Sequence, residues 1–329
     1  MAALPHIAVT VGDPAGIGPE VTAKALARPE VRAAATFTVI GPAALARAVL
    51  AAAPGVAWRE CAGPARFVHG AVQAECGAAA VAALRAAHDL ALAGQVDAVV
   101  TAPVNKAALH AAGTHVEGQT ELLAAWCGAT RYEMIGIAGA LRVMLLTRHM
   151  PLSEALARAC AAAAPGGGLE EHLALFDEAL RGLLGIAAPR IALAGLNPHA
   201  GEGGLLGREE LDRFAPAVAR ARARGLDVAG PVSPDAVFAQ ARAGRYDGVL
   251  ALYHDQAFIP LKLVAQDRGV TVIAGLPYLR LSPMHGTAFD IAGPFDGAGG
   301  GRADATNMAE ALLRAAEFAA RSKAAAGRS

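Results

Sequence analysis

Three histidines, His149, His199 and His254, each follow a short apolar stretch of the chain. The stretches RVMLLT, IALAGL and GVLALY have the length and the Val, Ile and Leu content of buried strands. In open α/β sheets, ligands bind beyond the carboxyl ends of the strands, which is where these imidazoles are expected. Three imidazole ligands would leave a coordination position free for substrate, so the pattern predicts an open divalent-metal site. For any one of these histidines, a purely structural role is the alternative.

Polar residues next to these histidines could orient the imidazole rings. Asp255 follows His254, while Asn197 and Glu202 flank His199. Metal-ligating histidines commonly donate their second ring N–H to such acceptors, so these neighbours fit the metal hypothesis.

Cations within apolar stretches indicate where an anionic substrate could bind. Lys262 lies in IPLKLV and Arg280 in GLPYLRLSP, and a buried cation needs an anionic partner. Lys106 follows another expected strand in TAPVNK. The pair Gln119-Thr120 precedes a helix, whose free N–H groups and the threonine hydroxyl can bind an anion. For each residue, a carboxylate or phosphate ligand and an ordinary solvated group both stay open.

Two further glycine-containing stretches could bind a ligand, the first an anion and the second a nicotinamide cofactor. VTVGDPAGIGPE leaves an expected strand at Gly12 and enters a helix near Pro19, and its glycines allow close approach of an anion. HGTAFDIAG begins at His285 and Gly286, and Asp290 within it could accept hydrogen bonds from a ribose. A carboxylate in that role favours NAD over NADP, because it repels a 2′-phosphate. A tight turn without ligand and a polar loop are the alternatives.

The elements that must position these residues alternate between strand and helix. PHIAVTVGD, FTVIG and VDAVVTAPV are expected strands, and PEVTAKALA, PAALARAVLAAA and TELLAAWCG are expected helices. This alternation predicts an α/β fold with largely parallel sheets covered on both faces. At 329 residues the chain exceeds the size at which one core usually stops growing, which is about 250–300 residues. Two domains are therefore expected.

Charge and hydropathy exclude several function classes. The formal net charge is zero, whereas nucleic-acid binding calls for a basic face. The N-terminal segment has no apolar core of a signal peptide, and the Ala-rich stretches are interrupted by charged residues, Gly and Pro. The cysteines are scattered without a CxxC pair, which disfavours disulfides and a zinc knuckle. We expect a soluble, cytoplasmic protein that binds neither nucleic acid nor a membrane.

A series of motifs resembles one known family from end to end. The motifs are GDPAGIGPE, TAPVNK, GQTELLA, LNPHAGEGG, YHDQ, GLPYLR and HGTAFDIAG. In this order they resemble the 4-hydroxythreonine-4-phosphate dehydrogenase family, which has an isocitrate/isopropylmalate dehydrogenase-like fold. The resemblance implies two α/β/α domains with a cleft between them. We expect residues 1–128 and 286–329 to form the first domain. Residues 129–285 would form the second, with the metal ligands and the dimer interface.

The resemblance also implies the reaction. Members oxidise 4-phosphohydroxy-L-threonine with NAD, and the product loses carbon dioxide to give 3-amino-2-oxopropyl phosphate for pyridoxal phosphate synthesis. A divalent metal such as Zn, Mg or Co would bind the three histidines, contributed across a homodimer with a shared active site. Thr120, Lys262 and Arg280 match substrate-contacting positions of the family. Lys106 and Asp235 are both candidates for the base that takes the hydroxyl proton.

Two positions depart from the family pattern. Gln119 stands where the family has histidine, and Thr271 stands where it has asparagine. Gln119 cannot be cationic and would attract a phosphate less strongly, while Thr271 lacks the amide. The alternatives are therefore a paralogue that acts on threonate or erythronate 4-phosphate, or on a carboxylated cis-dihydrodiol. Two other classes stay open: a phosphate-dependent acyltransferase and a non-catalytic protein that binds NAD or metal.

Overall fold

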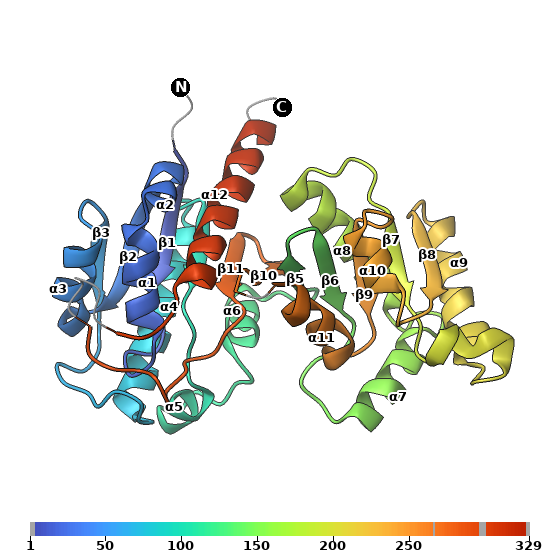
Figure 1. The fold of residues 1–329 in the computed structure, drawn as a ribbon, viewed down its shortest axis with the longest axis horizontal. Coiled ribbons are helices and arrows are strands. Elements are labelled where there is room, and N and C mark those ends of the chain that lie inside the picture. The colour runs from blue at the N-terminus through green and yellow to red at the C-terminus, as the bar shows by residue number, and fades with distance from the viewer. Residues whose placement is uncertain (1–3, 266, 296–300, 327–329) are drawn as a thin grey trace. The chain divides into compact units, whose positions relative to one another are not determined.

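The computed structural model describes residues 4–265, 267–295 and 301–326 (Figure 1). The chain divides into two compact units. Unit 1 comprises Met1–Thr130, Val270–Val272 and Leu276–Ser329, and unit 2 comprises Arg131–Gly269 and Ile273–Gly275. Residues 276–285, which were expected in the second domain, belong to unit 1. The reason is that they contain strand β11 (Leu279–Pro283), which pairs with a strand of unit 1.

The sheet of unit 1 has the strand order β3-β2-β1-β4-β11-β10. The strands are β1 (His6–Thr10), β2 (Thr36–Pro42), β3 (Ala57–Cys61), β4 (Ala98–Thr101), β10 (Val270–Ala274) and β11. Of β10, only Val270–Val272 belong to this unit. Neighbouring strands are parallel except β10, which runs antiparallel to β11. The central strands β1 and β4 are buried along nearly their whole length, as expected for parallel strands covered on both faces.

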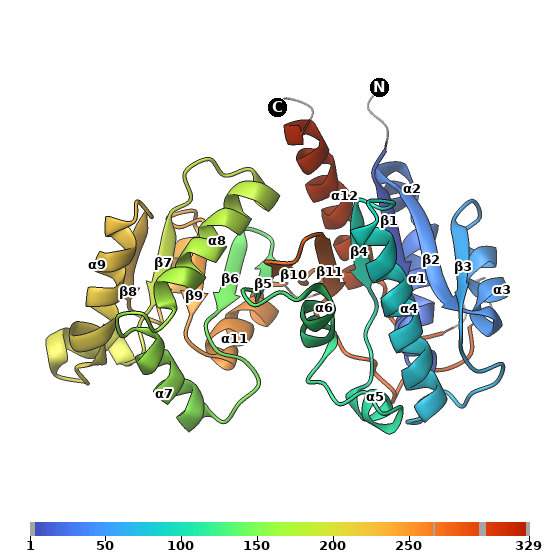
Figure 2. The same cartoon turned by 180° about the vertical axis from the view of Figure 1, so that it is seen from behind.

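Helices cover both faces of this sheet (Figures 1 and 2). Helix α4 (Ala74–Leu92) packs on β1 and β2, while α12 (Thr306–Ala326) packs on β4 and β11 from the other face. The remaining helices of the unit are α1 (Gly18–Ala27), α2 (Pro29–Ala34), α3 (Ala43–Ala52), α5 (Lys106–Ala111) and α6 (Gln119–Cys127). Small residues allow close packing: a Cβ on Gly77 of α4 would overlap the backbone carbonyl of Ala108 in α5.

The sheet of unit 2 has the strand order β5-β6-β9-β7-β8. The strands are β5 (Glu133–Ala138), β6 (Leu141–Leu145), β7 (Ile191–Ala194), β8 (Val228–Val232) and β9 (Gly248–Ala251). Strands β5 and β6 form an antiparallel hairpin, and the pairs β6-β9, β9-β7 and β7-β8 are parallel. The helices are α7 (Leu152–Ala162), α8 (Leu169–Leu184), α9 (Ala215–Ala223), α10 (Val237–Arg242) and α11 (His254–Ala265). The predicted α/β class with mostly parallel strands is confirmed in both units.

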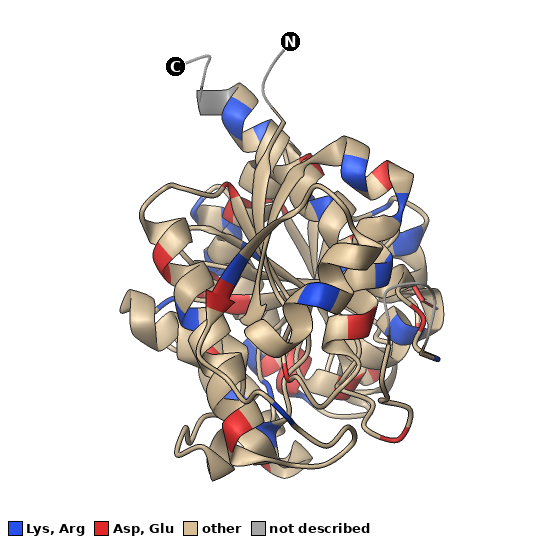
Figure 3. Ribbon diagram, turned by 90° about the vertical axis from the view of Figure 1, so that its left-hand side faces the viewer, with Lys and Arg blue, Asp and Glu red and all other residues tan. Residues whose placement is uncertain are grey.

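Charges of both signs are interspersed along the chain, as Figure 3 shows from one side. Many pair within a single helix at the i,i+4 spacing, for example Arg158 with Glu154 and Arg314 with Glu310. Within the described ranges, no helix has the length and apolar character needed to cross a membrane.

Candidate metal and substrate site

The three predicted strands before the histidines lie next to one another in unit 2. Strand β9 pairs in parallel with β6 on one side and with β7 on the other. Their carboxyl ends therefore meet at one edge of the sheet, and His149, His199 and His254 follow those ends. Sequence-distant residues are brought to the same edge, which is the ligand-binding edge of an open α/β sheet.

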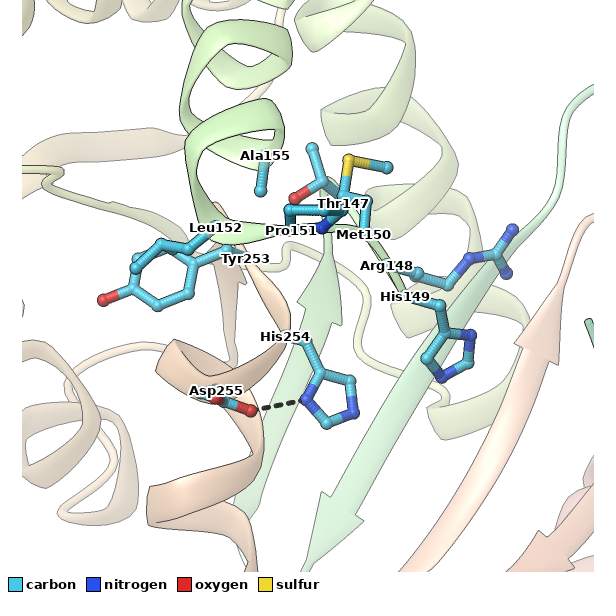
Figure 4. A pocket seen from close by; sticks show the side chains of 10 residues that line it. All are labelled: Thr147, Arg148, His149, Met150, Pro151, Leu152, Ala155, Tyr253, His254 and Asp255. Atoms are coloured by element: carbon cyan, nitrogen blue, oxygen red, sulfur yellow. Dashed lines mark hydrogen bonds and ion pairs between the residues drawn. The ribbon is translucent and has the colours of Figure 1, made fainter.

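His149 and His254 lie close together at this edge (Figure 4). Their ring centroids are 5.6 Å apart, and both residues line a cavity of about 410 Å³. The His254 ring also stacks on Phe258 of α11, with centroids 4.5 Å apart. This stacking holds the His254 ring in one plane.

Carboxylates face the Nδ1 atoms of two histidines. Asp255 Oδ1 lies 2.7 Å from His254 Nδ1, and Asp235 Oδ2 lies 4.0 Å from His199 Nδ1. The Ser233 hydroxyl donates to Asp235 at 2.5 Å and lowers the pKa of that carboxyl. A carboxylate at Nδ1 leaves Nε2 free as a metal ligand, so the residues present fit a divalent cation.

The three imidazoles do not converge within one chain. Among the described residues, no group of His, Cys, Asp and Glu ligand atoms within 4.8 Å of one another contains all three. Two of the three also have strained backbones, with φ of +32° at His149 and +53° at His199. Residues other than glycine rarely adopt this region, and such strain gathers at functional sites.

Glu210 fixes the loop that carries His199. Its Oε1 accepts the backbone N–H groups of Leu196 at 2.8 Å and Asn197 at 2.7 Å. Its Oε2 accepts from the Asn197 side chain at 2.9 Å, and the Glu210 residue is only 3% exposed. It begins a short π-helical turn, Glu210–Phe214. Sequence reasoning missed Glu210, because an acidic residue in REELDRF is typical of a solvated helix start.

Arg280 is a buried cation in unit 1. The residue is 3% exposed, and its Nη2 donates to the Thr101 hydroxyl at 2.6 Å. Burial lowers the pKa of its guanidinium to about 10. The Nε atom has no hydrogen-bond partner among the described residues. A buried donor of this kind favours an anionic ligand, as the sequence suggested.

The two positions that depart from the family pattern are both engaged by their own unit. Gln119 begins α6, and its Nε2 donates to the Ala102 carbonyl at 3.2 Å. Its Oε1 is buried without a partner in the described part of the chain. The Thr271 hydroxyl lies 2.7 Å from that of Ser282 on the neighbouring strand β11. Gln119 therefore keeps an acceptor available, whereas the Thr271 hydroxyl is already paired.

Other predicted site residues differ in exposure. Thr120 is 5% exposed, while Lys106 and Lys262 are exposed on α5 and α11. The apolar flanks of Lys262 lie on an open helix face, since Ile259 is 60% and Leu263 is 76% exposed. The chain therefore does not bury the Lys262 charge, and a role in substrate binding stays a prediction for both lysines.

The glycine-rich turn expected to bind an anion and the stretch expected to bind NAD lie against each other in unit 1. The backbone N–H of Ile17 donates to the Thr287 carbonyl at 3.0 Å. A Cβ on Gly16 would lie 2.9 Å from Thr287 Cβ and from the Thr287 carbonyl oxygen, so only glycine allows this approach. In the second stretch, His285 is half-buried and Gly286 and Asp290 are exposed. A nicotinamide dinucleotide there stays a prediction.

Asp13 is a buried carboxylic acid in the first of these stretches. Its backbone N–H donates to Pro103 at 3.0 Å, and its Oδ1 accepts from Ala15 N–H at 2.9 Å. Its Oδ2 has no partner among the described residues. Burial raises the pKa of Asp13 to about 6. Its burial could not be predicted from the sequence, because an aspartate before a Pro-Ala-Gly turn is typical of an ordinary turn residue.

Comparison with known proteins decides the family. Residues 20–315 match the family model described as pyridoxal phosphate biosynthetic protein PdxA. The chain belongs to this family. A 4-hydroxythreonine-4-phosphate dehydrogenase from Burkholderia vietnamiensis is 44% identical, over 97% of this chain and 98% of its own. A D-threonate 4-phosphate dehydrogenase from Salmonella typhimurium is 41% identical, over 95% of this chain and 98% of its own.

A solved structure of a PdxA relative has the same fold. The 4-hydroxythreonine-4-phosphate dehydrogenase from Klebsiella pneumoniae is 40% identical and superposes with a TM-score of 0.82. It covers 97% of this chain, which covers 99% of that one. The predicted family, fold and dehydrogenase class are therefore confirmed. Dependence on NAD and on a divalent metal stays a prediction.

Replacing Glu210 with Gln should destabilise unit 2. The amide would place N–H groups against the Asn197 side chain and remove charge-assisted bonds to two backbone N–H groups. We expect the free energy of unfolding to fall by about 1–3 kcal/mol. Urea denaturation measures this loss. Glu209→Gln is the matched control, because Glu209 accepts one bond from Asn197 and is only partly buried. An equal loss in both variants would contradict the role assigned to Glu210.

Asp13→Asn should change stability in a pH-dependent way. The folded-state pKa of Asp13, about 6, lies above the ordinary value of 3.8, so the folded chain binds this proton more tightly than the unfolded chain. The resulting stability is present below about pH 4 and is lost as pH rises through 6. The neutral variant should therefore gain up to about 3 kcal/mol relative to wild type between pH 4 and pH 7. Urea denaturation at both pH values measures the gain; a pH-independent difference would contradict it.

Proposed function

We propose that this member of the PdxA family is an NAD-linked dehydrogenase that requires a divalent metal. Its leading substrate is 4-phosphohydroxy-L-threonine, oxidised and decarboxylated to 3-amino-2-oxopropyl phosphate. The observation that carries the proposal is the set of three histidines at the ends of three neighbouring parallel strands, two of them with a carboxylate at Nδ1. The 44% identity to a relative named for that substrate supports the choice.

The side chains divide the work by their chemistry. His149, His199 and His254 would hold the cation, which when bound supplies a Lewis acid that lowers the pKa of the substrate hydroxyl. Asp255 holds the His254 ring through Nδ1. Asp235, whose pKa is lowered by the hydrogen bond from the Ser233 hydroxyl, is one candidate for the base that takes the hydroxyl proton. Lys106 is the other candidate base.

The proposed anion-binding residues are Arg280, Thr120 and Lys262. The Arg280 guanidinium is buried, and its Nε has no partner among the described residues, so it would bind the phosphate or carboxylate together with the Thr120 hydroxyl. Lys262 would add a second positive charge. His285, Gly286 and Asp290 would contact NAD, the Asp290 carboxylate accepting from a ribose hydroxyl.

A homodimer with a shared active site belongs to the same proposal. Two observations support it. The three imidazoles do not converge among the described residues of one chain. The helix that begins at His254 also exposes the apolar side chains of Ile259 and Leu263, which a second copy could cover.

D-Threonate 4-phosphate is the second candidate substrate. The chain is 41% identical to a relative named for it, close to the 44% found for the other activity. Gln119 and Thr271 both replace family residues, and the free Gln119 Oε1 is an acceptor that suits a substrate hydroxyl rather than a phosphate oxygen.

Replacing His254 with Ala should abolish metal-dependent activity. Loss of one of three ligands removes a Lewis acid worth several kcal/mol, so NADH formation should fall by roughly 10³-fold. Absorbance of NADH with 4-phosphohydroxy-L-threonine measures this. His172→Ala is the control. His172 lies on α8 of the same unit, where its Nδ1 bonds the Gly168 carbonyl and its Nε2 lies 3.9 Å from Glu133 Oε2. Full activity of chelator-treated wild type would refute the metal requirement.

Gln119→His should selectively raise the activity on phosphorylated substrates. A histidine at the start of α6 can carry a positive charge, so kcat/KM for 4-phosphohydroxy-L-threonine should rise by about tenfold. A panel of phosphohydroxythreonine, threonate 4-phosphate, erythronate 4-phosphate and unphosphorylated diols, assayed on wild type and variant, measures the change. Wild-type activity confined to unphosphorylated diols would overturn the phosphate assignment.

A further inference from the structure

Gln256 links two neighbouring strand ends in unit 2. Its Oε1 accepts the backbone N–H of Leu252 at 2.7 Å, and its Nε2 donates to the Gly195 carbonyl at 2.8 Å. Leu252 follows β9 and Gly195 follows β7, so both bonds lie just beyond the regular strand pairing. The Gln256 residue is 8% exposed. One buried side chain therefore fixes the separation of two strand ends.

A second side chain extends this link to the third strand. The Thr147 hydroxyl donates to the Leu252 carbonyl at 2.8 Å, and Thr147 follows β6. Both backbone groups of Leu252 are thus held by side chains from other positions. The series Thr147–Leu252–Gln256–Gly195, here called the strand-end link, crosses the carboxyl ends of β6, β9 and β7.

Each backbone contact of the strand-end link lies shortly before a predicted metal ligand. Thr147 and Leu252 are two residues before His149 and His254, and Gly195 is four residues before His199. A displacement at these points would move the imidazoles, and metal coordination tolerates deviations of only about 0.2 Å. The strand-end link therefore supports the backbone from which each of the three imidazoles projects.

We propose that Gln256 is a positioning residue that sets the affinity of the metal site by holding Gly195 against Leu252. This inference rests on the proposed metal function. Glutamine is suited to the position because it carries an acceptor and a donor in one short amide. Glutamate would place an oxygen against the Gly195 carbonyl, and leucine would leave a buried N–H and a buried C=O unpaired.

The test is a titration of the metal-free full-length protein with Co²⁺, followed by the visible absorption of the bound ion. Gln256→Leu should bind Co²⁺ about 10–100-fold more weakly than wild type, as for other residues that orient metal ligands. Thr147→Val should weaken binding in the same direction, whereas Thr147→Ser, which keeps the hydroxyl, should restore it. The altered absorption spectrum of Gln256→Leu should report a distorted ligand set.

Val218→Ala provides the matched control for lost stability. Val218 is buried in α9, and the deletion lowers the melting temperature without touching the strand-end link. It should keep the wild-type Co²⁺ affinity. Equal affinities of wild type and folded Gln256→Leu would overturn the inference while leaving the metal function intact. No Co²⁺ binding by wild type would instead refute the metal function itself.

Discussion

The parallel pairing of β6, β9 and β7 is the constraint on which the rest of the candidate site depends. Parallel neighbouring strands end at the same edge of the sheet, so the residues that follow each strand are brought together there by the pairing itself. The pairing also stops at that edge, which leaves backbone groups in a buried region that need other partners. Glu210, Gln256 and Thr147 supply those partners. These buried polar side chains are needed because the strand pairing ends shortly before the three histidines.

In unit 1 the buried polar groups are charged side chains rather than backbone groups at strand ends. It buries the guanidinium of Arg280, which donates to a hydroxyl, and the acid Asp13, whose pKa rises to about 6. In each group one buried atom, Arg280 Nε or Asp13 Oδ2, has no hydrogen-bond partner among the described residues. A buried polar atom without a partner lowers the stability of the fold, but it favours ligand binding, because a ligand of the right charge can supply the missing hydrogen bond. The two groups therefore make unit 1 a candidate for ligand binding.

Much of this arrangement could be predicted from short-range patterns. The strands before His149, His199 and His254 were predictable because each is a run of Val, Ile, Leu and Ala of strand length. Their adjacency was not, since the order β6-β9-β7 differs from the order in the chain. Contacts such as Gln256 with Gly195, 61 residues apart, depend on that order. The exposure of Lys262 was left open by the sequence, because an apolar run does not reveal which helix face is covered.

The left-handed backbone at His149 and His199 has a consequence for how the site would respond to its ion. An unfolded chain seldom visits this conformation at residues other than glycine, so these two candidate ligands are ordered during folding. Little conformational entropy is then left to lose when a cation arrives. A site built in this way should hold the same ligand geometry empty and loaded, and the protein should exchange its ion without remodelling the sheet edge that carries it.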